Sequence, residues 1–121
     1  MAPITLGHCI STLRPLRDAL DIINGKWKLQ ILVALRTGHQ RFRDIERAIP
    51  GISSKVLAKE LRDLEQHLLI SRTVHEGPPV LVTYEALAYA ETLDSVIFAL
   101  REWGAKHREK VMGQEVAELK A

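Results

Sequence analysis

The stretch "GISSKVLAKELRDLEQHLLISR", residues 51–72, decides the fold of this chain. It opens on Gly51, which forms a turn with the preceding Pro50, and the hydroxyl of Ser53 can then cap a helix. Apolar residues recur with helical spacing as far as about His67. The segment 70–75 that follows is short and rich in β-branched side chains. The stretch therefore predicts a helix that is followed at once by a β-strand.

The predicted helix has two different faces. Its apolar face is expected to be buried and consists of Val56, Leu57, Leu61, Leu64 and Leu68. The other face is polar and cationic with small residues, and consists of Ser54, Lys55, Ala58, Lys59 and Arg62. The first turns carry no carboxylate before Glu60. This second face is either the solvated side of an amphipathic helix or a surface that recognises a partner.

Three further helices are predicted upstream, over about 13–23, over 26–36 and from about Arg41 to the Pro-Gly turn. Pro15 falls in the opening turn of the first, where a missing N–H costs nothing. Downstream, Gly77-Pro78-Pro79 leads to an alternating strand over about 80–84, and a long helix begins near Leu87. The fold class is therefore mainly α with a small β-hairpin.

A three-helix unit followed by a β-hairpin is the winged form of the helix-turn-helix. The length of 121 residues favours one domain, with the winged core over about 25–85. The helices over about 11–23 and 87–112 are additional to that core. Their apolar faces have no evident place inside the core, so we expect them to form the interface of a homodimer.

The charge of the chain is unevenly distributed. The formal net charge is only +2, but residues 36–75 hold eight Lys/Arg against five Asp/Glu, whereas residues 76–121 hold five against eight. The basic excess thus coincides with the helix-turn-helix and the first strand. A basic region of this kind favours an anionic partner, although solvated helix faces also carry charge.

Several classes of protein are disfavoured by composition. The single cysteine excludes an intramolecular disulfide, and the five histidines include no pair at i, i+4 spacing that would suggest a metal site. There is no Gly-rich phosphate loop and no nucleophile with an evident base. We expect no enzymatic activity, no metal and no cofactor. The absence of a signal-peptide pattern and of a long apolar run predicts no membrane association and a cytoplasmic location.

The winged fold predicts which residues contact double-stranded DNA. A recognition helix enters the major groove with small and hydrogen-bonding residues at its N-terminal end, and cations reach guanine acceptors or phosphates. The candidates on this helix are Ser53, Ser54, Lys55, Ala58, Lys59 and Arg62. Arg41 can meet the DNA backbone or be an exposed loop cation. Arg72 can contact a phosphate or cover the edge of the core, and His75 near the wing tip can contact DNA or be an ordinary surface histidine.

At these residues the chain resembles the HxlR-type transcriptional regulators, a branch of the winged helix-turn-helix proteins related in architecture to the MarR group. The matching segments are "IINGKWKLQIL" (22–32), "TGHQRFRDIERAIPGIS" (37–53), "LAKELRDLEQHLLISR" (57–72) and "PPVLVTYEAL" (78–87), with Cys9 before them and Trp103 after them. The resemblance covers about residues 9–105. It implies a homodimer that binds a palindromic operator, usually near its own or an adjacent gene.

The chain also departs from the family pattern. The family commonly has Gly before the first wing strand, a position that we assign to Leu69 here. It commonly has Leu-Thr after the wing tyrosine and a Gly a few residues later, where this chain has Ala86, Leu87 and Ala90. These differences concern the junctions of the wing rather than the groove-facing helix.

Cys9 matches the position at which some members of this family sense electrophiles or oxidants. Such a role requires a thiolate, and with no second cysteine the chemistry is limited to sulfenic acid formation, alkylation or a disulfide between subunits. The alternative is an inert thiol. No pattern in the sequence identifies a small-molecule effector.

A rival function uses the same fold. A winged-helix domain can serve protein association alone, in which case Lys55, Lys59 and Arg62 are a solvated face. Sequence-specific DNA binding by a dimer predicts an affinity that falls steeply with salt, and the rival does not.

Overall fold

The computed structural model describes the backbone of residues 6–120 and the side chains of residues 10–114. In chain order the elements are α1 (Leu6–Ile23), α2 (Lys28–Arg36), α3 (Phe42–Ala48), α4 (Ser54–Gln66), β1 (Ile70–His75), β2 (Leu81–Ala86), the 3₁₀ helix η1 (Ala88–Leu93) and α5 (Asp94–Lys120). The chain divides into two compact units, one ending at Leu87 and the other beginning at Ala88. The described residues are mostly helical with one antiparallel hairpin, which confirms the predicted fold class.

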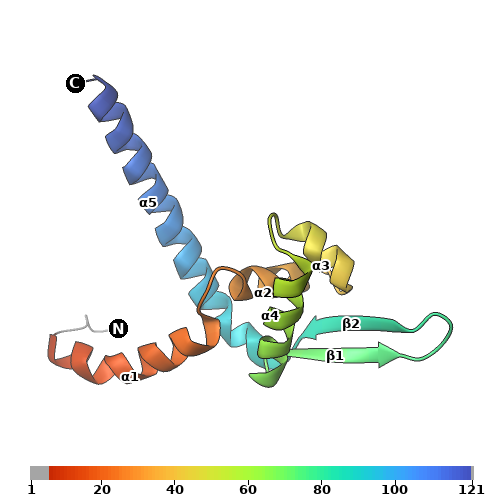
Figure 1. Ribbon diagram of the computed structural model, residues 1–121. Helices are drawn as coiled ribbons and strands as arrows, with labels where there is room; N and C mark the ends of the chain where they lie inside the picture. The colour runs from red at the N-terminus through yellow and green to blue at the C-terminus, as the bar shows by residue number, and fades with distance from the viewer. Residues whose placement is uncertain (1–5, 121) are drawn as a thin grey trace. The chain divides into compact units, whose positions relative to one another are not determined.

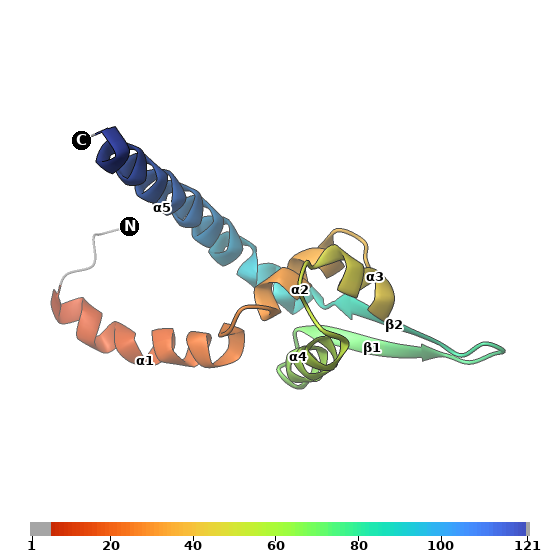
Figure 2. The same cartoon turned by 45° about the horizontal axis from the view of Figure 1, so that its top comes forward.

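The first unit contains the winged helix-turn-helix. Figure 1 shows α2, α3 and α4 grouped at the base of the hairpin, and Figure 2 shows the hairpin extending beyond the helices. Aliphatic side chains from the helices and the first strand are fully buried, namely Ile31, Leu32, Ile45, Leu57, Leu61, Leu64 and Ile70. Burial of this apolar surface stabilises the arrangement and holds α4 against the other elements.

The start of α4 follows the sequence prediction. The Ser53 side chain accepts a hydrogen bond from the Val56 backbone N–H at 3.2 Å, which satisfies one of the unpaired donors of the first turn. The preceding turn contains Gly51 at φ +86°, in the left-handed region that glycine adopts without a steric penalty.

The end of α4 differs from the prediction. Leu68 was expected in the buried stripe, but it has φ +62° and is 69% exposed. This left-handed residue turns the chain from the helix into β1, so the next residue, Leu69, fills the buried position at 3% exposure. The backbone conformation that favours glycine therefore falls on Leu68, one residue before the position to which we assigned the family glycine.

The wing is fastened to the loop that precedes α3. In the hairpin Ile70 pairs with Ala86 and His75 with Leu81, and residues 76–80 form the connection. The Tyr84 N–H donates to the Gln40 carbonyl at 2.8 Å, and the Gln40 side-chain amide donates to Glu85 Oε1 at 3.0 Å. The strand β2 is thus hydrogen-bonded to β1 along one edge and to the Gln40 carbonyl along the other.

The first helix is longer than predicted. It begins at Leu6 rather than near Leu13, so Pro15 lies inside the helix and not in its opening turn. Proline has no N–H, so one i→i−4 hydrogen bond is missing there. Leu13, Leu16 and Leu20 recur along one side of α1 and are each at least half exposed.

The second unit consists of η1 and α5. The predicted helix from about Leu87 begins instead as the 3₁₀ helix η1 and becomes an α-helix at Asp94. Along α5 the Trp103 and His107 rings stack with centroids 4.9 Å apart, and Phe98, Leu100 and Trp103 are at least half exposed. No helix in the described part of the chain has both the length and the apolar character needed to cross a membrane.

Candidate nucleic-acid interface

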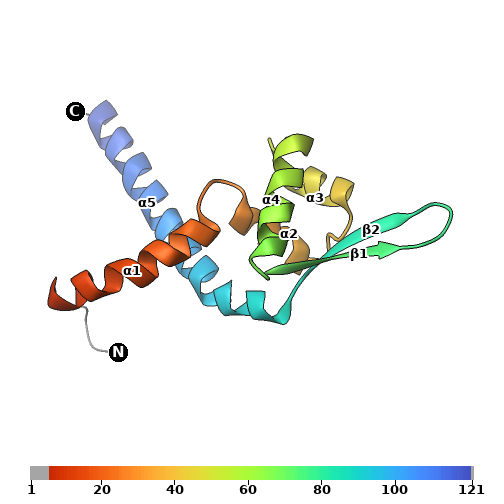
Figure 3. The same cartoon turned by 60° about the horizontal axis from the view of Figure 1, so that its bottom comes forward.

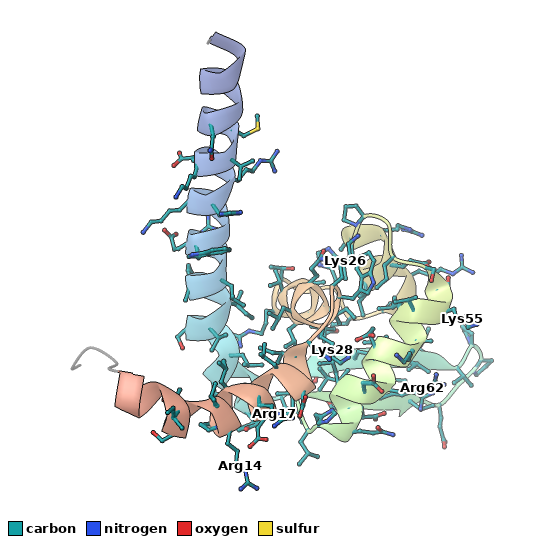
Figure 4. All side chains as sticks on the ribbon, turned by 60° about the vertical axis from the view of Figure 1, so that its left-hand side comes forward. Arg14, Arg17, Lys26, Lys28, Lys55 and Arg62 are labelled. Carbon is teal, nitrogen blue, oxygen red and sulfur yellow. The ribbon has the colours of Figure 1, made fainter. Side chains whose placement is uncertain are left out.

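The outward face of α4 is cationic. Lys55, Lys59 and Arg62 are all exposed, and among the described residues none of them forms an ion pair. Figure 4 shows Lys55 and Arg62 along this helix. Ala58, between them on the same face, is half-buried and adds no bulk. The face combines free positive charge with room for close approach, as entry into a major groove requires.

The inward face of α4 carries an ion pair that sequence reasoning missed. Lys28 Nζ on α2 lies 2.6 Å from Glu60 Oε2 and 3.5 Å from Asp63 Oδ2, and the side chains of Lys28 and Glu60 are only 8% and 12% exposed. Both carboxylates of α4 near this site are therefore matched by a cation from another helix. The only sequence signal was the i, i+3 spacing of Glu60 and Asp63, which does not identify the partner.

A groove of about 380 Å³ separates α4 from the base of the wing. It is lined by Ala58, Leu61, Arg62, Glu65, Arg72 and Tyr84. Figure 3 shows α4 beside the base of the hairpin, consistent with the contacts between α4 and β1. Arg72 pairs with Tyr84 across the two strands. The structure thus brings Arg62 and Arg72, from different elements, to one groove where both cations are exposed.

The two serines at the start of α4 make different hydrogen bonds. Ser53 is the N-cap, as predicted, and its oxygen accepts from the Val56 N–H. The Ser54 hydroxyl donates to Glu46 Oε2 on α3. The first turns of α4 contain no carboxylate of their own before Glu60, but α3 places the carboxylate of Glu46 beside Ser54.

The remaining predicted contact residues lie on the same unit. Arg41 is exposed at the position that precedes the first residue of α3, and its side chain does not cap that helix. His75 is exposed near the end of β1, and its Nε2 lies 2.9 Å from Thr83 Oγ1 on β2. The His75 ring is thus held to the neighbouring strand, whereas Arg41 is an exposed cation at the start of α3.

Two further sequence predictions concern Cys9 and metal binding. The Cys9 backbone belongs to α1, but its side chain lies outside the described residues, so its role stays a prediction. Among the described residues, no group of three or more His, Cys, Asp or Glu side chains could hold a metal ion.

Comparisons with known proteins agree with this geometry. The profile of the HxlR-like helix-turn-helix family matches residues 22–112. The HTH-type transcriptional regulator YtcD of Bacillus subtilis is 37% identical over 100 residues, which cover 83% of this chain and 79% of YtcD. YdeP of the same organism, also an HTH-type transcriptional regulator, is 35% identical over 103 residues, which cover 85% of this chain and 80% of YdeP.

Solved structures of a related regulator are similar to this chain in both fold and sequence. The redox regulator HypR in its reduced form superimposes with a TM-score of 0.74 at 30% identity, over 82% of this chain and 98% of HypR. HypR in its oxidised form matches with a TM-score of 0.70 at 32% identity, over 76% and 95% of the two chains.

Proposed function

This chain belongs to the HxlR-like helix-turn-helix family of transcriptional regulators, and on that premise we propose that it binds a palindromic operator as a homodimer with sequence specificity. In this proposal α4 lies in the major groove and the wing follows the adjacent backbone. We further propose that the protein acts in the cytoplasm, has no enzymatic activity and uses no cofactor.

The observation that carries the proposal is the unpaired cationic face of α4. Within the described part of the chain, no carboxylate forms an ion pair with Lys55, Lys59 or Arg62. Each can neutralise a DNA phosphate or approach a guanine edge, and phosphate neutralisation releases condensed counterions. Arg72 extends the same cationic surface into the groove beside the wing.

The proposal of a homodimer is supported by apolar side chains outside the winged core. On α1, an open depression is lined by three leucines and two charged residues, namely Leu13, Leu16, Leu20, Arg17 and Asp21. Figure 4 labels Arg14 and Arg17 on this helix. On α5, Phe98 and Trp103 are 61% and 64% exposed. Exposed apolar patches of this kind mark interaction surfaces, and a second copy of the chain would remove them from water.

A response to oxidants is a second proposal, favoured by the structural neighbour HypR, which is a redox regulator solved in reduced and oxidised forms. In this chain Cys9 would be the sensor. Oxidation of Cys9 and its partner-subunit copy by diamide would form a disulfide between subunits, with both thiol hydrogens passing to the reduced hydrazine product. Cys9→Ser should then bind DNA identically in the presence and absence of diamide, whereas the wild type should change its affinity.

Titration of the protein against DNA at several salt concentrations tests the main proposal. We expect retardation of the DNA upstream of the protein's own gene at low salt, with an affinity that falls linearly in a plot of log K against log salt. Random DNA of the same length is the control and should bind far more weakly. If neither DNA is retarded at low salt, the rival function in protein association is favoured instead.

A further inference from the structure

The contact between Ser54 and Glu46 restricts the chemistry of the recognition helix. Ser54 is exposed and Glu46 half-buried, and the Ser54 hydroxyl donates to Glu46 Oε2. An ionised carboxylate accepts hydrogen bonds but cannot donate them, so the single hydroxyl hydrogen of Ser54 is committed to Glu46. Ser54 therefore meets any third group as an acceptor alone.

Ser53 has the opposite hydrogen-bonding role, because its hydroxyl hydrogen remains available to donate. Its oxygen accepts from the Val56 N–H at 3.2 Å, and within the described part of the chain no acceptor takes its hydrogen. Ser53 can thus donate to a phosphate or a base acceptor. Two adjacent serines that look equivalent in the sequence differ because only one of them faces a carboxylate from α3.

Base edges in the major groove differ in the groups that match an acceptor. Cytosine presents its N4 amino group and adenine its N6 amino group, whereas guanine presents O6 and N7 and thymine presents O4. The Ser54 oxygen, whose hydrogen is donated to a carboxylate, attracts the amino groups of cytosine and adenine. It is repelled by the acceptor oxygens of guanine and thymine. Glutamate itself is a known acceptor for cytosine N4.

We propose that the Glu46–Ser54 pair selects a base that presents an exocyclic amino group in the major groove, cytosine or adenine, at one position of each operator half-site. This inference rests on the DNA-binding function proposed above. Glu46 acts in it as a specificity-determining residue contributed by α3, not by the recognition helix itself.

The surroundings explain how a carboxylate is tolerated at a DNA-binding surface. The N-terminus of α4 carries the positive end of the helix dipole, which stabilises an adjacent anion. Lys55 follows Ser54 directly, and Arg43 and Arg47 are exposed on α3. These cations offset the general repulsion between Glu46 and phosphates, so that the carboxylate discriminates among bases without preventing binding.

Selection from a pool of random DNA duplexes tests the inference on the full chain. The wild-type protein should enrich a palindrome with one invariant cytosine or adenine in each half-site, and replacing that base by guanine or thymine should weaken binding about tenfold. If no sequence is enriched, both the proposed function and this inference are overturned. An enriched palindrome supports the function and allows the pair to be tested separately.

Two variants then isolate the pair. In Glu46→Gln the amide can donate to a base as well as accept from Ser54, so discrimination at that position should fall about tenfold while the other positions are unchanged. Ser54→Ala removes the acceptor and should reduce the same preference. Thermal unfolding followed by circular dichroism establishes that both variants are folded.

Asp44→Asn is the matched control. It removes one negative charge from α3, as Glu46→Gln does, but no described contact joins Asp44 to Ser54. It should tighten binding to all sequences alike and leave the order of base preferences unchanged. If Glu46→Gln and Ser54→Ala both keep the wild-type preference at every position, the inference is wrong although the proposed function stands.

Discussion

The helices α4 and α5 both carry large apolar side chains, but this chain buries those of α4 and leaves several of those of α5 exposed. In α4, Leu57, Leu61 and Leu64 are at most 2% exposed. In the much longer α5, Phe98 and Trp103 remain more than 60% exposed. An isolated helix is marginal in water, so most helical stability in proteins comes from packing of an apolar face. The packing of α4 is thus satisfied within one chain, whereas α5 leaves large apolar side chains exposed, which in our proposal a second copy of the chain covers.

The largest expected effect concerns the buried side of α4. Lys28→Met should lower the free energy of unfolding by about 3–5 kcal/mol, because Glu60 is left buried without its cation. Chemical denaturation measures the change. The double variant Lys28→Met/Glu60→Leu should recover most of the loss, since a well-packed apolar pair can replace a buried ion pair. A double variant as unstable as Lys28→Met would contradict this account.

A smaller effect is expected on α5, and in a different measurement. Trp103→Ala should weaken self-association about thirtyfold if Trp103 is a central contact of the dimer, since such residues contribute about 2 kcal/mol or more. Sedimentation over a range of concentrations measures the change. Val80→Ala, which removes an apolar side chain that is 62% exposed at the end of the hairpin connection, is the control and should leave association unchanged. Equal association of Trp103→Ala and the wild type would exclude Trp103 from the interface.

The groove beside α4 gives a prediction about DNA affinity. Arg72→Ala should weaken binding to all sequences alike and reduce the slope of log K against log salt by about 1, because one phosphate contact is lost. Fluorescence anisotropy with labelled duplexes measures the slope. Lys106→Ala on α5 removes an exposed cation outside the winged unit and should not alter it. A changed base preference in Arg72→Ala would show that this arginine reads bases instead.

The smallest expected effect is at the end of α4. Leu68→Gly should raise the free energy of unfolding by about 0.5–1 kcal/mol, because glycine relieves the left-handed conformation but is more flexible when unfolded. The midpoint of urea unfolding reports the change. Leu68→Ala keeps a β-carbon in the same conformation and should show no gain. Equal midpoints for the two variants would mean that the backbone at residue 68 is not strained.

Much of the fold was predictable because it depends on local spacing. The strand over 70–75, the Ser53 cap and the apolar face of α4 all follow from residues close together in the chain. The errors lie at boundaries, where competing local preferences are similar. Leu68 was assigned to the buried stripe by its spacing, although the chain leaves the helix at that residue and Leu69 takes the buried place.

The candidate site was predictable in its cations but not in its anions. Lys55, Lys59, Arg62 and Arg72 were identified from one helix face and one strand, and the structure exposes all four on the winged unit. Glu46 was not identified from the sequence, because its partner Ser54 lies on another helix.

By itself the sequence determined the order of the elements, the apolar and cationic faces of α4 and the resemblance to the HxlR-type regulators. Only the tertiary structure decided that Lys28 neutralises Glu60, 32 residues away, that Gln40 holds the wing and that Glu46 takes the hydrogen of Ser54. The physical reason is that helical and strand periods depend on neighbouring residues alone. Contacts between elements depend on how the elements cross, and that is set by packing of the whole core.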